Sequence, residues 1–112
     1  MNAVASGSLD RQLRFAIAHT RLIEVRYGGR LRVAEPHDYG IMNGSPKVLV
    51  YQLRASGGPP DSGARGWRLL DVEKISLCAV SETTFSGSRA DSSQRHFSWD
   101  DLFARVTGSG AG

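Results

Sequence analysis

Apolar residues near the start of the chain recur at helical spacing. The positions i, i+4, i+7 and i+8 are occupied by Leu9, Leu13, Ala16 and Ile17. Because this spacing places apolar side chains on one face, it predicts a short amphipathic helix over about residues 9–19. Ser8 is a favourable N-cap for that helix. Residues 1–8, which are small and polar, are predicted to be a disordered N-terminus.

After residue 20 the apolar spacing changes from about 3.6 to 2, which indicates strands. Ile23, Val25 and Tyr27 alternate with charged residues. Gly28-Gly29 follows at once, and two glycines in this place predict a tight turn, because glycine adopts positive φ at little cost. The pattern therefore predicts a β-hairpin.

The second strand of this hairpin alternates as well. Leu31 and Val33 are predicted to lie on its buried face, and Arg30 and Arg32 on the other face. Pro36 has no N–H to give to a strand ladder. The hairpin is therefore predicted to stop one residue before it.

Four later segments are typical of strands. Residues 37–42 predict a short, irregular strand, and residues 47–54, which are continuously apolar in their middle, predict a central one. Residues 67–70 and 75–80 predict two more. The loop at 55–66 is rich in Gly and Pro but lacks the Gly-Lys-Ser/Thr ending of a phosphate-binding P-loop.

The C-terminal part has two different compositions. Residues 81–97 are rich in Ser, Thr and Gly and are predicted to form a linker arm. Residues 98–106 carry apolar side chains at helical spacing, which predicts an amphipathic helix of about two turns. Such a helix is too short to be stable alone, so Trp99 and Phe103 are expected to dock on the domain or on a partner. Residues 107–112 are predicted to be a disordered tail.

Together these elements predict a mainly β domain of the α+β type, with about five strands, a leading helix and a short C-terminal helix. The chain has 112 residues, a size typical of one domain. Small sheets bend or close, because closure protects their edges and buries one face. We therefore expect a strongly bent sheet or a small β-barrel over residues 9–80.

Composition excludes several classes of protein. The longest apolar runs fall far short of the ~20 residues that a membrane-spanning helix needs, so no membrane association is expected. The N-terminus lacks the basic start and the long apolar stretch of a secretory signal. The single cysteine, Cys78, cannot form an intramolecular disulfide, which favours a cytoplasmic protein.

Positive charge is unevenly distributed along the chain. There are 14 basic and 11 acidic residues, a formal net charge of +3, and nearly all the basic residues are arginines. Within residues 11–32 there is one acid and six arginines: Arg11, Arg14, Arg21, Arg26, Arg30 and Arg32. Arginine binds phosphate through its planar fork of donors, so this stretch predicts an anion-binding face. The alternative is that these arginines only solvate a helix and two strands.

The predicted strands carry side chains of two kinds that suit nucleic acid. The candidates for phosphate contacts are Arg30, Arg32, Arg54 and Arg68. The candidates for stacking on bases are Tyr39, Tyr51 and Trp67. Charge would give salt-dependent affinity, and the rings would give contact with bases. The alternative is that Tyr51 and Trp67 are core residues, and that Arg54 and Arg68 pair with Asp71 or Glu73.

His37 is a further candidate, because a neutral imidazole can bind a ligand phosphate. The alternative is a turn histidine that is bonded to the backbone. The histidines and Cys78 have no metal-ligand spacing, so no metal or cofactor is expected. Paired carboxylates and a catalytic triad are also missing from the pattern, and the chain is not expected to be an enzyme.

The order of these segments resembles the WYL domain. The matching positions are Ala16, Ala18, Tyr27, Arg32, Val33, Pro36, the strand 49–53, Trp67-Arg68-Leu69 and Lys74-Ile75. The resemblance covers about residues 9–80. The signature Trp-Tyr-Leu is absent, and Val-Tyr-Gln-Leu stands near its place. The winged-helix domain that precedes the barrel in many members of the family is not expected from these residues.

The resemblance implies a small Sm-like or SH3-like β-barrel preceded by a helix. It also implies a regulatory or sensor domain that binds single-stranded nucleic acid or a nucleotide ligand through basic and aromatic side chains. Such bacterial domains act in transcriptional regulation and in stress or phage-defence control. The alternative function is a protein-interaction module that forms homodimers or docks to a larger partner through Trp99 and Phe103.

Overall fold

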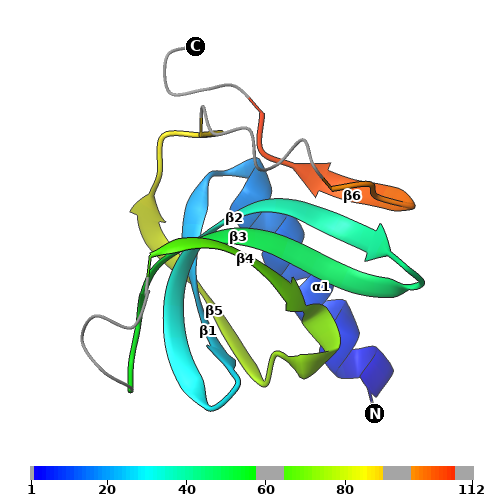
Figure 1. Cartoon of the computed structure of the whole chain (residues 1–112), viewed down its shortest axis with the longest axis horizontal. Helices are drawn as coiled ribbons and strands as arrows, with labels where there is room; N and C mark the ends of the chain where they lie inside the picture. The colour runs from blue at the N-terminus through cyan, green and yellow to red at the C-terminus, as the bar shows by residue number, and fades with distance from the viewer. Residues whose placement is uncertain (1, 58–64, 90–96, 108–112) are drawn as a thin grey trace.

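The computed structural model describes residues 2–57, 65–89 and 97–107. These residues form one α-helix, one 3-10 turn and one sheet of six antiparallel strands (Figure 1). In chain order the elements are α1 (Asn2–Ala18), β1 (Arg21–Tyr27), β2 (Arg30–Met42), β3 (Ser45–Ala55), β4 (Gly66–Asp71), η1 (Val72–Lys74), β5 (Leu77–Thr84) and β6 (Asp101–Arg105). The prediction of a small, mainly β domain is confirmed. The predicted tail from residue 108 lies outside the described residues, as do parts of the predicted loop and linker arm.

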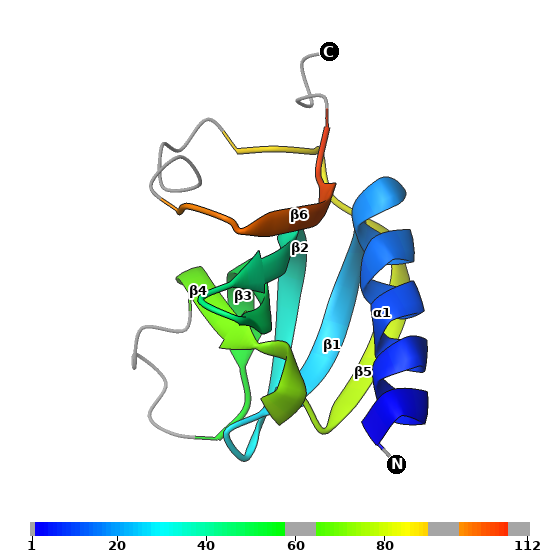
Figure 2. The same ribbon diagram turned by 90° about the vertical axis from the view of Figure 1, so that its right-hand side faces the viewer.

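The sheet is curled but open. Its strands follow the order β4-β3-β2-β1-β5, and β6 pairs with β2 beside this path. Within the described residues no pairing joins β4 to β5, so the strands form no closed barrel. Figure 2 shows the sheet curling around its core, with α1 along the side formed by β1 and β5.

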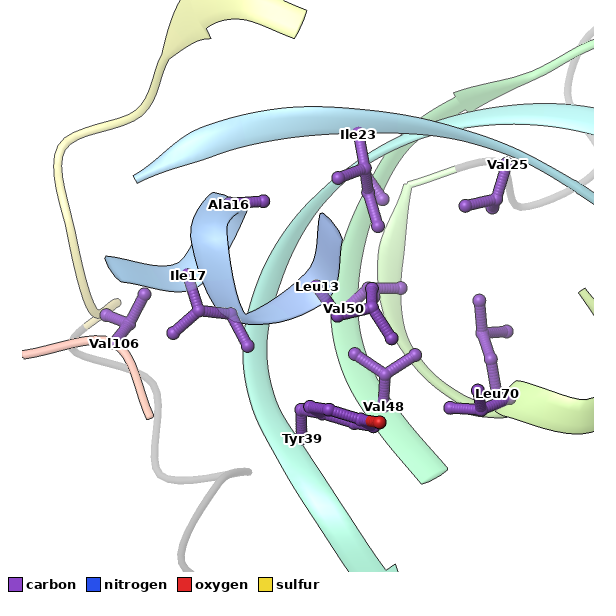
Figure 3. Close-up of a cluster of buried hydrophobic side chains, with 12 residues drawn as sticks. Leu13, Ala16, Ile17, Ile23, Val25, Tyr39, Val48, Val50, Leu70 and Val106 are labelled. Carbon is purple, nitrogen blue, oxygen red and sulfur yellow. The ribbon is translucent and has the colours of Figure 1, made fainter. Parts of the chain in front are cut away.

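The helix α1 supplies the predicted apolar face. Leu13, Ala16 and Ile17 are buried and point toward side chains of the sheet, among them Val48 and Val50 (Figure 3). The helix begins at Asn2, so residues 2–8, which were expected to be disordered, are helical. Only the two alanines among these residues are good helix formers, so intrinsic propensity accounts for little of this earlier start. Among the described residues no helix is both long and apolar enough to cross a membrane.

The two faces of the sheet differ in what covers them. We call the face that carries Ile23, Val25, Val48 and Val50 the inner face, because it packs against α1 and holds the main core. The opposite face is the outer face. Side chains opposite each other in an antiparallel pair lie on the same face, so the strand register assigns each residue to one of the two.

The prediction that Leu31 and Val33 are the buried residues of the hairpin is wrong. Arg32 lies opposite Val25, which is fully buried, and therefore belongs to the inner face. Val33 lies opposite the exposed Glu24 on the outer face. Alternation identifies which residues share a face, but it does not say which face meets the core, and here the arginines are on the core side.

β2 does not stop before Pro36, as its sequence predicts, but continues to Met42. Around Pro36 the neighbour on one edge of β2 changes from β1 to β6. Its pairing with β1 ends at Ala34, and its pairing with β6 begins at Asp38. A bulge interrupts the pairing with β3 between Pro36 and Asp38. Proline is tolerated at a bulge, because the ladder is already disrupted there.

The predicted C-terminal helix over residues 98–106 is also wrong. Residues 101–105 form the strand β6, which pairs with the second half of β2. That half of β2 extends past the end of β1, and its backbone would otherwise lack partners on one edge. A two-turn helix has little intrinsic stability, so the free edge of β2 decides the local structure. β5 extends to Thr84, four residues beyond its predicted end.

Candidate anion-binding site

Three of the four predicted phosphate-binding arginines gather at one end of the inner face. Arg30 and Arg32 come from the start of β2, and Arg68 comes from β4. Arg32 lies opposite Val25, and Arg68 lies opposite Val50. Both of these valines belong to the buried core. The inner face therefore changes from valines to arginines within one or two residues, where the hairpin leaves the core.

Arg32 is held in place by two oxygens. Its Nε donates to the backbone oxygen of Tyr27 at 3.1 Å, and its NH1 donates to Oε1 of Gln52 at 2.9 Å. The guanidinium carbon stands 5.4 Å from the centre of the Tyr27 ring. Gln52 is 2% exposed, although it lies in the otherwise apolar middle of β3. Burying an amide at this position is favourable only when it is hydrogen-bonded, and Arg32 supplies that bond.

Arg30 and Arg68 also donate to neutral oxygens. Arg30 bonds the backbone oxygens of Ser56 and Gly57, at 3.0 and 2.6 Å. Arg68 bonds the backbone oxygen of Trp67 at 2.9 Å. These bonds orient the two guanidinium groups.

Arg30 and Arg68 are close enough to Arg32 for their charges to act on it. Partial burial lowers the pKa of Arg32, and the positive charges of Arg30 and Arg68 lower it further. A lowered pKa means that the protonated form of Arg32 is less favourable here than in water. An anion among the three groups would relieve that repulsion, so the electrostatics favour an anionic ligand.

Gly66 makes room for this cluster at the start of β4. Its φ of +137° lies in a region that side-chain-bearing residues rarely adopt. A Cβ at this position would stand 3.0 Å from NH1 of Arg68. Glycine therefore suits this backbone conformation and leaves space beside the guanidinium group.

The remaining predicted residues do not join this cluster. Arg54 is exposed and lies opposite Val33, so it belongs to the outer face. Tyr51 and Trp67 lie opposite each other on the outer face too, with ring centres 5.3 Å apart. Asp71, considered as a partner for Arg54 or Arg68, pairs instead with Lys47. The predicted combination of arginines and rings on one face is therefore divided between two faces.

Tyr39 is a core residue. It is 4% exposed, and its hydroxyl donates to Oδ1 of Asp10 at 2.7 Å. Burial raises its pKa, and the hydrogen bond to Asp10 raises it further. Phe103 packs edge-on against Tyr39, with ring centres 5.2 Å apart. Neither ring is placed to stack on an exposed base, and Phe103 packs against its own chain.

His37 lies in a second buried cluster, on the outer face. It is fully buried, and its Nε2 stands 3.0 Å from Oε1 of Glu35. The ring packs against Trp67 and Phe85, at 4.8 and 5.2 Å between ring centres. His37 is therefore closed off from any ligand in solution. Within the described residues no three His, Cys, Asp or Glu side chains gather as a metal site.

Two arginines fasten the C-terminal part of the chain to this outer cluster. Arg89 donates from Nε and NH2 to both oxygens of Glu35, each at 2.9 Å, and lies 3.6 Å above the Tyr51 ring. Arg105 donates to both oxygens of Asp38, at 2.9 and 3.0 Å. Bidentate pairs of this kind fix orientation as well as charge. Tyr51 is thus covered by Arg89.

Trp99, predicted as a partner contact, precedes β6 and is partly buried. Its indole Nε1 is buried without a hydrogen-bond partner among the described residues.

Gln52, which orients Arg32, was not predicted as a site residue from the sequence. A polar residue in the middle of an apolar central strand was the signal that could have identified it.

Comparisons of this chain with family models, with curated proteins and with solved structures gave no match.

Proposed function

We propose that this domain binds a phosphate-bearing ligand of the nucleotide class, either a nucleotide or single-stranded nucleic acid, through Arg30, Arg32 and Arg68. The observation that carries the proposal is the placement of three guanidinium groups on the inner face, next to the core, where the charges of Arg30 and Arg68 lower the pKa of Arg32. A chain that needed arginine only for solubility would place it on the outer face, in full contact with water. A role as a regulatory or sensor domain, as the WYL resemblance implies, is part of the same proposal.

A protein-interaction role is the second candidate, and a different surface supports it. Leu77 is 51% exposed at the start of β5. It lies opposite Arg26 of β1, which in turn lies opposite Leu31 of β2, so these three side chains share the outer face. Leu77 and Leu31 thus flank Arg26 on this face, and exposed apolar side chains beside a charged one suit a docking surface.

The test of the nucleotide-class proposal is fluorescence anisotropy with labelled single-stranded DNA, single-stranded RNA and duplex DNA at two salt concentrations. Unlabelled nucleotides serve as competitors. We expect micromolar or tighter binding to at least one single-stranded probe or nucleotide, with affinity that falls as salt rises.

Arg32→Ala should weaken that binding at least tenfold, because it removes one of three charges that act together. Arg54→Ala is the matched control: it also removes one arginine from a strand, but on the outer face. Thermal unfolding of both variants separates lost binding from lost folding. Equal losses for the two variants, or no binding by the parent protein at low salt, would contradict the proposal.

A further inference from the structure

The outer face of β1 carries two opposite charges, Glu24 and Arg26. Both side chains are exposed, and they stand on either side of Val25, whose own side chain is buried on the inner face. In the part of the chain that the structure describes, neither charge forms a salt bridge or a side-chain hydrogen bond. Each is therefore available to an opposite charge on another molecule.

Apolar side chains stand on both sides of each charge, because the neighbouring strands place them there. The register puts β5 on one side of β1 and β2 on the other. Of the six residues concerned, the four on β1 and β5 are exposed and the two on β2 are partly exposed. They form two adjacent rows across the outer face, Leu77–Arg26–Leu31 and Ala79–Glu24–Val33.

The two rows complement each other in charge and in size. In a symmetric dimer the same patch of both copies meets across a two-fold axis, so the patch must be complementary to itself. An axis between two stacked sheets, above Val25 and perpendicular to β1, brings the first row of one copy over the second row of the other. Arg26 then faces Glu24 of the second copy.

The same operation matches the apolar side chains by size. Leu77 faces the smaller Ala79 of the second copy, and Leu31 faces the smaller Val33. Each of these contacts occurs twice, as two-fold symmetry requires. Sheets that pack face to face lie about 10 Å apart, a distance that an arginine and a glutamate side chain span together.

We propose that a second copy of this chain docks on these two rows and forms a symmetric dimer through the outer faces of β1, β2 and β5. The apolar contacts supply the attraction, and the crossed pairs of Arg26 and Glu24 fix the register of the two sheets. The inference rests on the protein-interaction role and names its partner. It is independent of the arginine cluster around Arg32, which lies on the opposite face.

The experiment is sedimentation velocity of the whole chain at concentrations from about 1 µM to about 1 mM, which brackets the dissociation constants of weak dimers. We expect a shift from monomer to dimer as the concentration rises. Glu24→Arg alone and Arg26→Glu alone each bring like charges together, and each should weaken dimerisation at least tenfold. The variant with both exchanges should dimerise again, and so should an equimolar mixture of the two single variants.

Leu77→Ser should also weaken the dimer at least tenfold. The matched control is Leu102→Ser, which changes a leucine that is 37% exposed on β6, away from the two rows, and should leave the dimer intact. Thermal unfolding of each variant shows that it is folded. Because a folded variant can lose the dimer only through its surface, the comparison locates the interface.

The outcomes separate this inference from the proposed functions. A chain that stays monomeric at every concentration would overturn it, while binding of a phosphate-bearing ligand, measured through Arg32→Ala, would stand. A dimer that is lost in Leu102→Ser but kept in Leu77→Ser would also overturn it, because self-association would then use another surface. So would charge exchanges that weaken the dimer singly but do not restore it in combination.

Discussion

The phenol oxygen of Tyr27 accepts a hydrogen bond from the backbone N–H of Asp71 at 3.0 Å. Tyr27 ends β1 and Asp71 ends β4, and these two strands are not neighbours in the sheet. The bond therefore spans the curl of the sheet where no ladder connects its two sides. It also stands next to Arg32, which bonds the backbone oxygen of the same tyrosine.

Tyr27→Phe should lower the free energy of unfolding by about 1 kcal/mol, because one net hydrogen bond is lost while the ring stays. Urea unfolding, followed by tryptophan fluorescence, measures this. Tyr51→Phe is the control, since the Tyr51 ring contacts Arg89 and Trp67 through its faces and edges. A Tyr27→Phe variant as stable as the parent would show that the hydrogen bond between Asp71 and Tyr27 does not stabilise the curled sheet.

Acid should weaken the attachment of Arg89 to Glu35. Burial alone would raise the pKa of Glu35, but hydrogen bonds from His37 and Arg89 outweigh burial and hold that pKa below its ordinary value of 4.5. A carboxylate with a lowered pKa stabilises the fold above pH 4.5. That contribution is lost as the pH falls through the folded-state pKa.

Glu35→Gln should therefore be less stable than the parent at pH 7, and the difference should narrow as the pH falls below 4.5. Urea unfolding at several pH values between 3 and 7 provides the measurement. Glu24→Gln, at an exposed position on β1, is the control and should differ little from the parent throughout. If the difference in unfolding free energy between Glu35→Gln and the parent were the same at every pH, the ion pair would contribute nothing to the pH dependence of stability.

Gly40→Ala should loosen β6. A Cβ on Gly40 would stand 2.2 Å from the backbone oxygen of Asp101 and 2.9 Å from Cα of Leu102. These atoms belong to backbone, so the strands must separate, at a cost of about 1–3 kcal/mol. Hydrogen exchange of the β6 amides should accelerate. Gly7→Ala in α1 is the control: it meets only the end of Arg11, at 3.9 Å, and should be neutral or slightly stabilising.

Cys78 should react slowly with thiol reagents. Burial raises the pKa of its thiol to about 11, so little thiolate exists near neutral pH. Labelling with iodoacetamide at pH 7.5 should be far slower in the folded protein than in urea. Fast labelling of the folded chain would show that β5 opens readily from β1, to which it is paired.

Local patterns in the sequence identified most elements but not how they meet. The spacing of Leu13, Ala16 and Ile17 correctly predicted the buried side of α1. The glycine turn correctly predicted the β1–β2 hairpin. These features depend on neighbours in sequence, and period and turn chemistry are local properties.

The features that could not be predicted depend on distant residues. Pro36 lies within β2 because it stands between the part of β2 that pairs with β1 and the part that pairs with β6. Residues 101–105 form a strand because β2 offers an unpaired edge, which no local pattern reveals. In the candidate site, alternation along the strand correctly predicted that Arg30 and Arg32 lie on the same face. The location of Arg68 and Arg54 on opposite faces followed only from the register.

Because β2 pairs with β6, the sheet can be completed only late in the synthesis of the chain. Asp38 and Arg105 meet although they are 67 residues apart in sequence. As the ribosome makes the chain, the N-terminal helix and the first hairpin emerge early, because they come first in the sequence. One edge of the second half of β2 stays unpaired until β6 has left the exit tunnel. Nascent chains stalled before residue 101 should therefore attract chaperones, and chains in which β6 has left the exit tunnel should not.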